Sequence, residues 1–406
     1  MKNPFFDNKS NIYKEMCECR HFLHSHPELS LEESITSDFI FNFLRDKANI
    51  KVEQIHRGYA KHGVVAIIDG NGGASESRKT IALRADMDAL PLEEKANPLC
   101  ENGVSFKSIH ANKMHACAHD IHMAALLGAA IYLNQNQNKN FNGQVILIFQ
   151  PGEEGLFGAK LMIEDGLLDK FKMDAIFGLH IWPDLPFGEW GITEGAAMAN
   201  SDMFTIKIRG HGGHGALPHK TKDPIIVSAH LILALQNLIS RMNNPFSPAV
   251  LSITQINSGT THNIIPEEAV IAGTLRTLST EVQSSLIEKI KQITNGIAST
   301  FDCTIDLDYQ FGYPVMINSS KEAKFCSSVV NKIFPGSKVH HSMTASLGGE
   351  DFAYFLQKIP GNMIKLGVLG NDNKNISLHN PYFVPSDEIM LAAAGYWIGL
   401  VNNYLK

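Results

Sequence analysis

The sequence predicts an α/β protein that carries an inserted ferredoxin-like α+β domain. Two observations support this fold class. Apolar strands alternate with helices over residues 1–197, which is typical of a mixed, mostly parallel sheet flanked by helices. Residues from about 200 to 309 then follow the order β-α-β-β-α-β of a ferredoxin-like unit. Because the first pattern resumes afterwards, we predict one domain of residues 1–197 and 309–406, interrupted by a second domain of residues 198–308.

The first predicted elements begin the main domain. Residues 11–29 have the pattern of a helix. Ser30 and Glu33 have the spacing of a capping box for a second helix, whose apolar residues between positions 35 and 44 fall on one face. Two strands follow, at residues 63–69 and 80–85. Neither strand alternates strictly between apolar and polar residues, which predicts burial on both faces of a mostly parallel sheet.

The remaining elements complete both domains. In the main domain we expect a helix at residues 122–134, strands at 144–149 and 174–179, and a final helix at about 387–404. In the inserted domain, residues 204–208 alternate between apolar and polar side chains, which predicts a strand with one solvated face. The other elements of this domain are helices at 223–242 and 281–299 and strands at 249–256, 268–277 and 303–309.

The composition is typical of a cytoplasmic globular protein. The 406 residues are 44% hydrophobic and 19% charged, so a large core can form within two or three domains. The net charge is −6 and no run of Lys or Arg would follow a phosphate backbone, which argues against nucleic acid as a partner. No apolar stretch approaches the roughly 20 residues of a membrane span, and the first residues lack the apolar segment of a signal peptide. Six cysteines are too few for a disulfide framework in so long a chain.

Four short runs, far apart in the sequence, together offer a set of metal ligands. They are Cys117-Ala-His119-Asp120, Glu153-Glu154, Gly178-Leu-His180 and Leu378-His379. A thiol, imidazoles and carboxylates form a ligand set for a divalent transition metal. Each residue alone has a more ordinary interpretation, because a free cysteine usually packs in a core and a lone histidine after an apolar strand is usually a core histidine. Taken jointly, the residues complete a ligand set and predict a metal site.

Several carboxylates add a base and supporting groups to this site. Glu153 and Glu154 are adjacent, so they repel each other unless a cation is present or one of them is protonated. With a metal, one can coordinate while the other takes a proton from water; the alternative is a solvated loop. Asp86 and Asp88 follow an apolar strand, where α/β sheets bind ligands, although such residues also form turns. We expect Asp86, Asp88 and Asp120 to orient ligands through hydrogen bonds.

A series of longer motifs connects these runs to a known family. In chain order they are RHFLHSHPELSLEE, ALRADMDALP, MHACAHDIHMAALLGAA, FQPGEEGLFGA, GLHIWP, GHGGHGALPH, HNIIPEEAVIAGTLRT, GGEDFAYF and LHNPYFVPSDE. Together they resemble the metal-dependent amidohydrolases that include hippurate hydrolase, indole-acetyl-amino-acid hydrolase and N-acetyl-diaminopimelate deacetylase. These enzymes are relatives of aminoacylase and the dinuclear-zinc carboxypeptidases. The resemblance extends over nearly the whole chain.

The resemblance implies a role for each candidate residue. The metal ligands would be Cys117, His119, Glu154, His180 and His379, the general base and acid Glu153, the carbonyl-polarising group His214, often acting in the partner subunit, and the substrate-carboxylate binders Asn263 and Arg276. One or two divalent ions (Zn, Mn, Ni or Co) would be bound, and the inserted domain would serve as a lid and form a homodimer. Two residues depart from the family pattern. Ala118 stands where the family usually has Gly, so it carries strain if that position needs a positive φ. Gly215 stands where Ala is commoner.

The expected reaction is hydrolysis of an N-acyl amino acid to a carboxylic acid and a free amino acid. Glu153 would accept a proton from water and later deliver it to the leaving amine. Acetyl, benzoyl and arylacetyl groups all remain candidates for the acyl part. A dipeptidase or aminopeptidase using the same site is an alternative, as is a non-catalytic protein that binds amino-acid derivatives. The binding protein would have no need for a carboxylate beside the ligand carboxylate.

Overall fold

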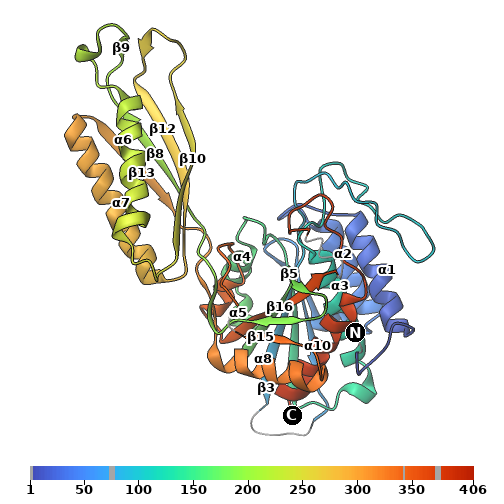
Figure 1. The fold of residues 1–406 in the computed structure, drawn as a ribbon. Helices are drawn as coiled ribbons and strands as arrows, with labels where there is room; N and C mark the ends of the chain where they lie inside the picture. The colour runs from blue at the N-terminus through green and yellow to red at the C-terminus, as the bar shows by residue number, and fades with distance from the viewer. Residues whose placement is uncertain (1–2, 73–77, 342, 371–375) are drawn as a thin grey trace. The chain divides into compact units, whose positions relative to one another are not determined.

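The protein forms two compact units in the computed structural model, which describes residues 3–72, 78–341, 343–370 and 376–406. Unit 1 comprises Met1–Gly195, Ile317–Thr344 and Tyr354–Lys406, and unit 2 comprises Ala196–Met316 with Ala345–Ala353 (Figure 1). The boundary expected at residue 308 would cut a strand that continues to Gln310. Pairing between strands therefore extends the second unit beyond the range predicted from the sequence.

A mixed eight-stranded sheet forms the centre of unit 1, in the order β1-β2-β4-β3-β5-β16-β6-β15. Its strands are β1 (Ile55–Tyr59), β2 (Gly63–Asp69), β3 (Lys79–Asp86), β4 (Gly143–Gln150), β5 (Ala175–Pro186), β6 (Trp190–Ile192), β15 (Val339–His341) and β16 (Gly361–Leu369). The pairs of β3 with β4 and β5, and of β5 with β16, are parallel. The pairs of β2 with β1 and β4 are antiparallel, although β2 is largely buried as expected. Burial on both faces predicts parallel pairing, but β2 is buried and antiparallel to both of its neighbours.

Helices cover this sheet and supply much of the core. They are α1 (Asn11–Ser25), α2 (Ser34–Asp46), α3 (His119–Leu133), α4 (Gly158–Glu164), α5 (Leu167–Lys170), α8 (Ser320–Ile333), α9 (Ala353–Leu356, which begins in unit 2) and α10 (Ile389–Tyr404). Helices α3 and α10 are apolar on all sides and almost completely buried, as expected for helices enclosed by other elements. The metal-site run beginning at Cys117 is therefore attached to a rigid core helix.

Two local expectations in unit 1 need correction. Ser30 and Glu33 do not form a capping box, because the carboxylate of Glu28 caps α2 by accepting from the backbone N–H of Thr36 at 2.8 Å. Glu33 instead accepts from the N–H of Gly152 at 2.8 Å, so its tertiary partner replaces the local one. Strand β5 also continues past residue 179 to Pro186, because β16 pairs with it along this length.

Unit 2 has the βαββαβ order that the sequence predicts. Its antiparallel sheet has the order β10-β12-β8-β13, with α6 and α7 on one side (Figure 1). The elements are β8 (Asp202–Arg209), α6 (Pro224–Asn237), a π-helical turn (Leu238–Met242), β10 (Ala249–Ser258), β12 (Glu268–Thr277), α7 (Thr280–Phe301) and β13 (Thr304–Gln310). A short pair is formed by β9 (Gly213–His214) with β11 (Ile264–Ile265), and another, at the points where the chain passes from one unit to the other, by β7 (Gly195–Met198) with β14 (Met316–Asn318). Buried and exposed positions alternate along β8 and β12, which places one face of the sheet in the core.

One segment of unit 2 is more apolar than expected. The helical stretch Pro224–Met242 is 19 residues long with a mean hydropathy of 1.5, so by length and composition alone it could cross a membrane. This corrects the expectation that no stretch approaches that length. Only 28% of the stretch is buried. Its buried side chains, including Val227, Leu231 and Leu235, pack in the core of unit 2 and leave an apolar face outside.

Candidate metal centre

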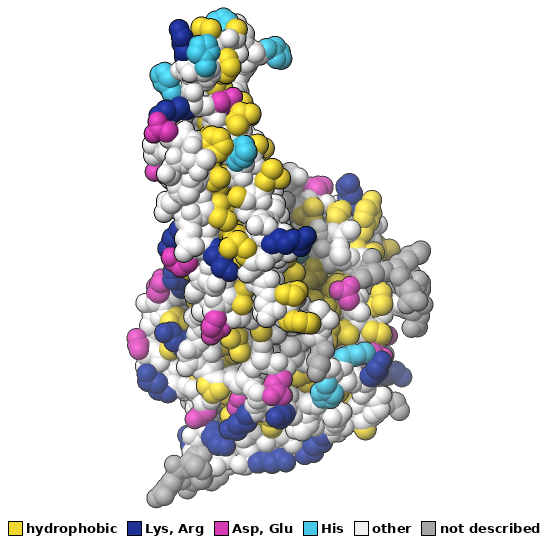
Figure 2. All heavy atoms as spheres, turned by 60° about the vertical axis from the view of Figure 1, so that its left-hand side comes forward, with side chains coloured by type: hydrophobic (Ala, Val, Ile, Leu, Met, Phe, Trp, Pro, Cys, Tyr) yellow, Lys and Arg dark blue, Asp and Glu magenta, His cyan; other side chains and the backbone are white. Residues whose placement is uncertain are grey.

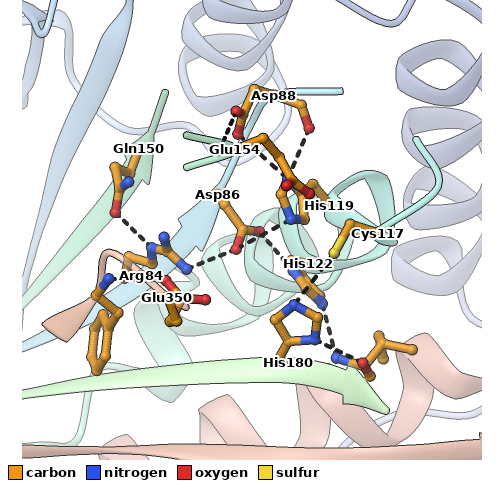
Figure 3. A network of polar contacts seen from close by, with 12 residues as sticks. Arg84, Asp86, Asp88, Cys117, His119, His122, Gln150, Glu154, His180 and Glu350 are labelled. Atoms are coloured by element: carbon orange, nitrogen blue, oxygen red, sulfur yellow. Dashed lines mark hydrogen bonds and ion pairs between the residues drawn. The ribbon is translucent and has the colours of Figure 1, made fainter. Parts of the chain in front are cut away.

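The candidate ligands are positioned by several different segments of unit 1. Cys117 lies two residues before His119, which is the first residue of α3. Glu153 and Glu154 follow the end of β4, and His379 lies in a turn with a φ of 61°. His180 is in the middle of β5 rather than at its end. Chain segments far apart in the sequence thus meet beside the sheet, as Figure 3 shows for Cys117, His119, His180 and Glu154.

The potential ligand atoms lie close enough together to share a cation. Within each of three overlapping groups they lie within 4.8 Å of one another, and the groups are Cys117–His119–His180, Cys117–Glu154–His379 and His119–Glu153–Glu154. The Sγ atom of Cys117 is 3.6 Å from Nε2 of His180. Nε2 of His379 is 3.4 Å from Oε1 of Glu154. The structure therefore brings all six residues to one place.

The two buried histidines present the same ring atom to this place. Nδ1 of His119 donates to the carbonyl of Asp88 at 2.8 Å, and Nδ1 of His180 donates to the carbonyl of Ile181 at 2.7 Å. A proton held on Nδ1 leaves Nε2 as the atom that can coordinate a metal. Nε2 of His119 is fully buried and makes no hydrogen bond to a described residue. A buried, unsatisfied ring nitrogen beside a thiol and carboxylates fits a bound cation.

Asp86 and Asp88 hold these ligands in place. Asp88 Oδ2 accepts from Ser30 Oγ at 2.5 Å and from the backbone N–H of Glu154 at 2.8 Å, while its carbonyl orients His119. Asp86 Oδ2 accepts from Arg84 at 2.7 Å and is 3.7 Å from Nε2 of His119. Although burial opposes ionisation, His119, His122 and Arg84 hold the pKa of Asp86 well below its usual range. Two fixed negative charges therefore lie beside the ligand cluster.

His122 is a site residue for which no separate role was predicted from the sequence. Its Nδ1 donates to Asp86 Oδ1 at 2.6 Å, and its Nε2 accepts from the N–H of Ile181 at 3.0 Å (Figure 3). Both ring nitrogens are thus occupied, so His122 ties α3 to β5 next to His180. Its spacing from His119 puts both rings on one helical face, and this was the signal available in the sequence.

Asp120 contacts residues of α1 and not the ligand histidine that it was expected to orient. Its carboxylate accepts from Arg20 Nε and contacts His24 Nδ1, both at 3.0 Å, instead of orienting a ligand histidine. Burial opposes its ionisation, but Arg20 and His24 hold the pKa of Asp120 far below its usual range. From the first turn of α3 the side chain reaches α1, so Asp120 fixes the position of this helix against α1.

Comparison with known proteins places this site in a family. The model of peptidase family M20/M25/M40 matches residues 82–403. The chain belongs to that family.

Relatives of this family M20 chain match it over almost its whole length. It is 40% identical over 401 residues to hippurate hydrolase of Campylobacter jejuni, covering 98% of each chain. It is also 40% identical over 392 residues to N-acetyl-L-cysteine deacetylase of Bacillus subtilis, covering 96% of this chain and 88% of that protein. A solved structure of a dinuclear metal binding peptidase of family M20 from Bacillus subtilis is similar to it with a TM-score of 0.81 and 33% identity, covering 97% and 98% of the two chains.

The carboxylates around the site of this M20 chain attract positive charge, whether protons or a metal ion. Burial, together with Glu154 and Glu153, raises the pKa of the Cys117 thiol well above its usual value. Burial opposes protonation of His119, but Asp86 and Asp88 raise its pKa to about 10. Both residues therefore carry protons in the absence of a cation, and a metal must displace those protons when it binds.

Ala118 stands at a position where the family usually has glycine, and its backbone is left-handed. Its φ is 65° and its ψ is 23°, in the left-handed region where a Cβ atom costs about 1–2 kcal/mol. The position does need a positive φ, so Ala118 carries the strain that was expected for a residue other than glycine. This strained residue lies between the candidate ligands Cys117 and His119, directly before the start of α3.

The other three predicted site residues lie in unit 2. His214 in β9 pairs with Ile264 in β11, and its Nδ1 accepts from the N–H of Ala216 at 3.0 Å. The carbonyl of Asn263 accepts from the N–H of Gly215 at 2.8 Å, so Asn263 and His214 belong to one local structure. Arg276 lies on β12 and donates to Thr274 at 3.1 Å. Their roles toward the substrate remain predictions.

Proposed function

We propose that this protein is a metal-dependent amidohydrolase that cleaves N-acyl amino acids into a carboxylic acid and a free amino acid. The observation that carries the proposal is the cluster of five potential ligands with Glu153 as an additional carboxylate beside them. A ligand cluster with a separate base is what hydrolysis requires and what simple binding does not. Two relatives over nearly the full length are a hippurate hydrolase and an N-acetyl-L-cysteine deacetylase, which supports an N-acyl amino acid as substrate.

The residues proposed to hold the metal are Cys117, His119, Glu154, His180 and His379, for one or two divalent ions. When bound, such an ion supplies Lewis acidity, which makes a water molecule more acidic and draws charge from a carbonyl oxygen. Zn, Mn, Ni and Co all accept a mixed set of sulfur, nitrogen and oxygen ligands. The fit of the buried Nε2 atom of His119 supports this assignment.

The remaining groups are proposed to bind the substrate and move protons. Glu153 accepts a proton from water and delivers it to the leaving nitrogen. His214 donates a hydrogen bond to the carbonyl oxygen as negative charge develops there. Arg276 and Asn263 bind the carboxylate of the amino acid, since a guanidinium can form two parallel hydrogen bonds to it. Burial lowers the pKa of Arg276 from its very high usual value.

Removal and replacement of the metal would test this function directly. Protein stripped of metal by a chelator should be inactive, and reloading with a divalent transition metal should restore release of free amine from hippurate and N-acetyl amino acids. Unblocked dipeptides, assayed in parallel, should react more slowly, because two full-length relatives are a hippurate hydrolase and an N-acetyl-L-cysteine deacetylase. Full activity in stringently metal-free protein, or a clear preference for dipeptides, would overturn the proposal.

We also propose a cytoplasmic homodimer that forms through unit 2. All six cysteines are free thiols, which is usual in reducing compartments. The outer face of α6 exposes Ile225, Ile226 and Leu233, and β10 is an edge strand of its sheet with Ile256 exposed. Figure 2 shows apolar side chains gathered along this unit. An apolar helix face beside a free strand edge suits a symmetric contact with a second copy.

Charges on this face should separate the dimer. The double variant Ile226→Glu, Leu233→Glu should sediment and scatter light as a monomer, while the wild type has twice that mass. Leu233 is 72% exposed, so the change should leave the fold of unit 2 intact. The matched control is Ile109→Glu, at a residue of unit 1 that is 65% exposed. A monomeric wild type, or a double variant that remains dimeric, would contradict the prediction.

A further inference from the structure

Lys365 on β16 is a buried cation without a hydrogen-bond acceptor. Its side chain is only 4% exposed, and its Nζ makes no hydrogen bond to any residue in the described part of the chain. The ammonium lies 3.5 Å from the centroid of the Trp182 ring. A cation–π contact returns only part of the free energy that is lost when an ammonium leaves water. The arrangement is therefore incomplete without an acceptor or a counter-charge.

The strand register places Lys365 beside the proposed metal ligands. Lys365 pairs with His180 in the parallel ladder of β16 and β5, so the two side chains point to the same face of the sheet. Trp182 follows two residues later on that face, with its ring centroid 5.9 Å from that of His180. Because the ammonium lies over Trp182, it is displaced from its own Cα toward the carboxyl ends of the strands. Ligands bind at those ends in sheets of this kind.

The charge of Lys365 has no hydrogen-bonded counter-charge among the residues that the structure describes. Burial lowers its pKa to about 8, so the amine still carries its proton at neutral pH. Asp184, on the neighbouring strand β5, acts against this lowering, but its side chain is exposed to water and no hydrogen bond joins it to Lys365. A ligand carboxylate would supply the missing acceptor, and the Trp182 ring would provide an apolar wall for methylene groups.

We propose that Lys365 binds a carboxylate at the far end of the substrate's acyl group. The preferred substrates would then be amino acids acylated with a dicarboxylic acid, such as N-succinyl or N-glutaryl amino acids. This inference rests on the proposed amidohydrolase function. The acyl end is favoured over the amino-acid end because Asn263 and Arg276 are already proposed for the amino-acid carboxylate. Two residues along a strand span about 6–7 Å, which suits a short acyl chain between the metal ligands and Lys365.

A pair of matched product analogues tests the proposal without turnover. Glutarate and valerate have the same number of carbons, but only glutarate has a second carboxylate. By calorimetry on the metal-loaded protein, glutarate should bind about 10-fold more tightly than valerate. Lys365→Met should abolish this preference and leave valerate binding unchanged. The control Lys321→Met removes a lysine that is 86% exposed and should behave as the wild type.

The outcomes separate this proposal from the function on which it rests. Lys365→Met removes an uncompensated buried charge, so the variant should fold, and Lys365→Gln provides a second neutral side chain. Equal affinity of the wild type for glutarate and valerate would overturn the role of Lys365, as would a preference that survives both substitutions. A glutarate preference that depends on Lys365, in a protein that cleaves no acylated amino acid, would support the subsite and overturn the hydrolase function.

Discussion

Replacing Glu153 with Gln is expected to lower kcat by about 10²–10⁴ while the protein keeps its metal. Glutamine has the shape of glutamate but cannot accept a proton from water. Glu153 is 6% exposed and its carboxylate lies within 4.8 Å of the ligand atoms of His119 and Glu154, so it would be close to a metal held by the five proposed ligands. Elemental mass spectrometry should therefore find an unchanged metal content, while kcat with an N-acyl amino acid falls.

The neighbouring residue is the matched control for this experiment. Glu154→Gln removes a proposed ligand, so this variant should lose metal affinity, and excess metal should restore part of its activity. Excess metal should restore nothing in Glu153→Gln. The roles of the two residues would be reversed if Glu153→Gln lost its metal and Glu154→Gln retained it.

The elements and ligand runs were predictable because they depend on local sequence. Strand β2 was expected at residues 63–69 and occupies them, since a continuous apolar run between polar segments is a strong signal. A helix was expected at residues 122–134, and α3 occupies His119–Leu133, so the run from Cys117 leads directly into it. Adjacent carboxylates after a buried strand, as in Glu153 and Glu154, likewise depend on only a few residues. Local pattern therefore identified most of the groups that the structure brings together.

Partners distant in the sequence could not be predicted in the same way. Asp120 was expected beside a ligand histidine, yet it pairs with Arg20, 100 residues away, because α3 packs against α1. Ser30 was expected to cap a helix, yet it bonds to Asp88. Lys365 is an ordinary lysine in the sequence, and only the register of β16 against β5 places it beside His180. Hydrogen bonds of buried polar groups are decided by tertiary packing, which a single sequence does not reveal.

His214→Ala is the second substitution with a large expected effect, a loss of roughly 10²–10³ in kcat without loss of metal. The N–H of Ala216 donates to Nδ1 of His214, so a neutral His214 carries its proton on Nε2. An Nε2–H group can donate to a substrate carbonyl oxygen as charge develops on it. The side chain of His214 is exposed, and its only role in the alternative view is to stabilise the turn at Ala216. That alternative predicts a lower melting temperature with nearly normal kcat.

Mixing two inactive variants would show whether His214 serves its own subunit or a partner. In a heterodimer of His214→Ala with Glu153→Gln, one metal site has an intact Glu153 in its own subunit and an intact His214 in the other. If His214 acts across the dimer, that site is complete and activity should return as subunits exchange. If His214 acts within its own subunit, each site lacks one group and the mixture stays inactive. Subunit exchange, followed by mass spectrometry of differently tagged chains, must be complete before activity is measured. A fully exchanged, inactive mixture would exclude action of His214 across the dimer.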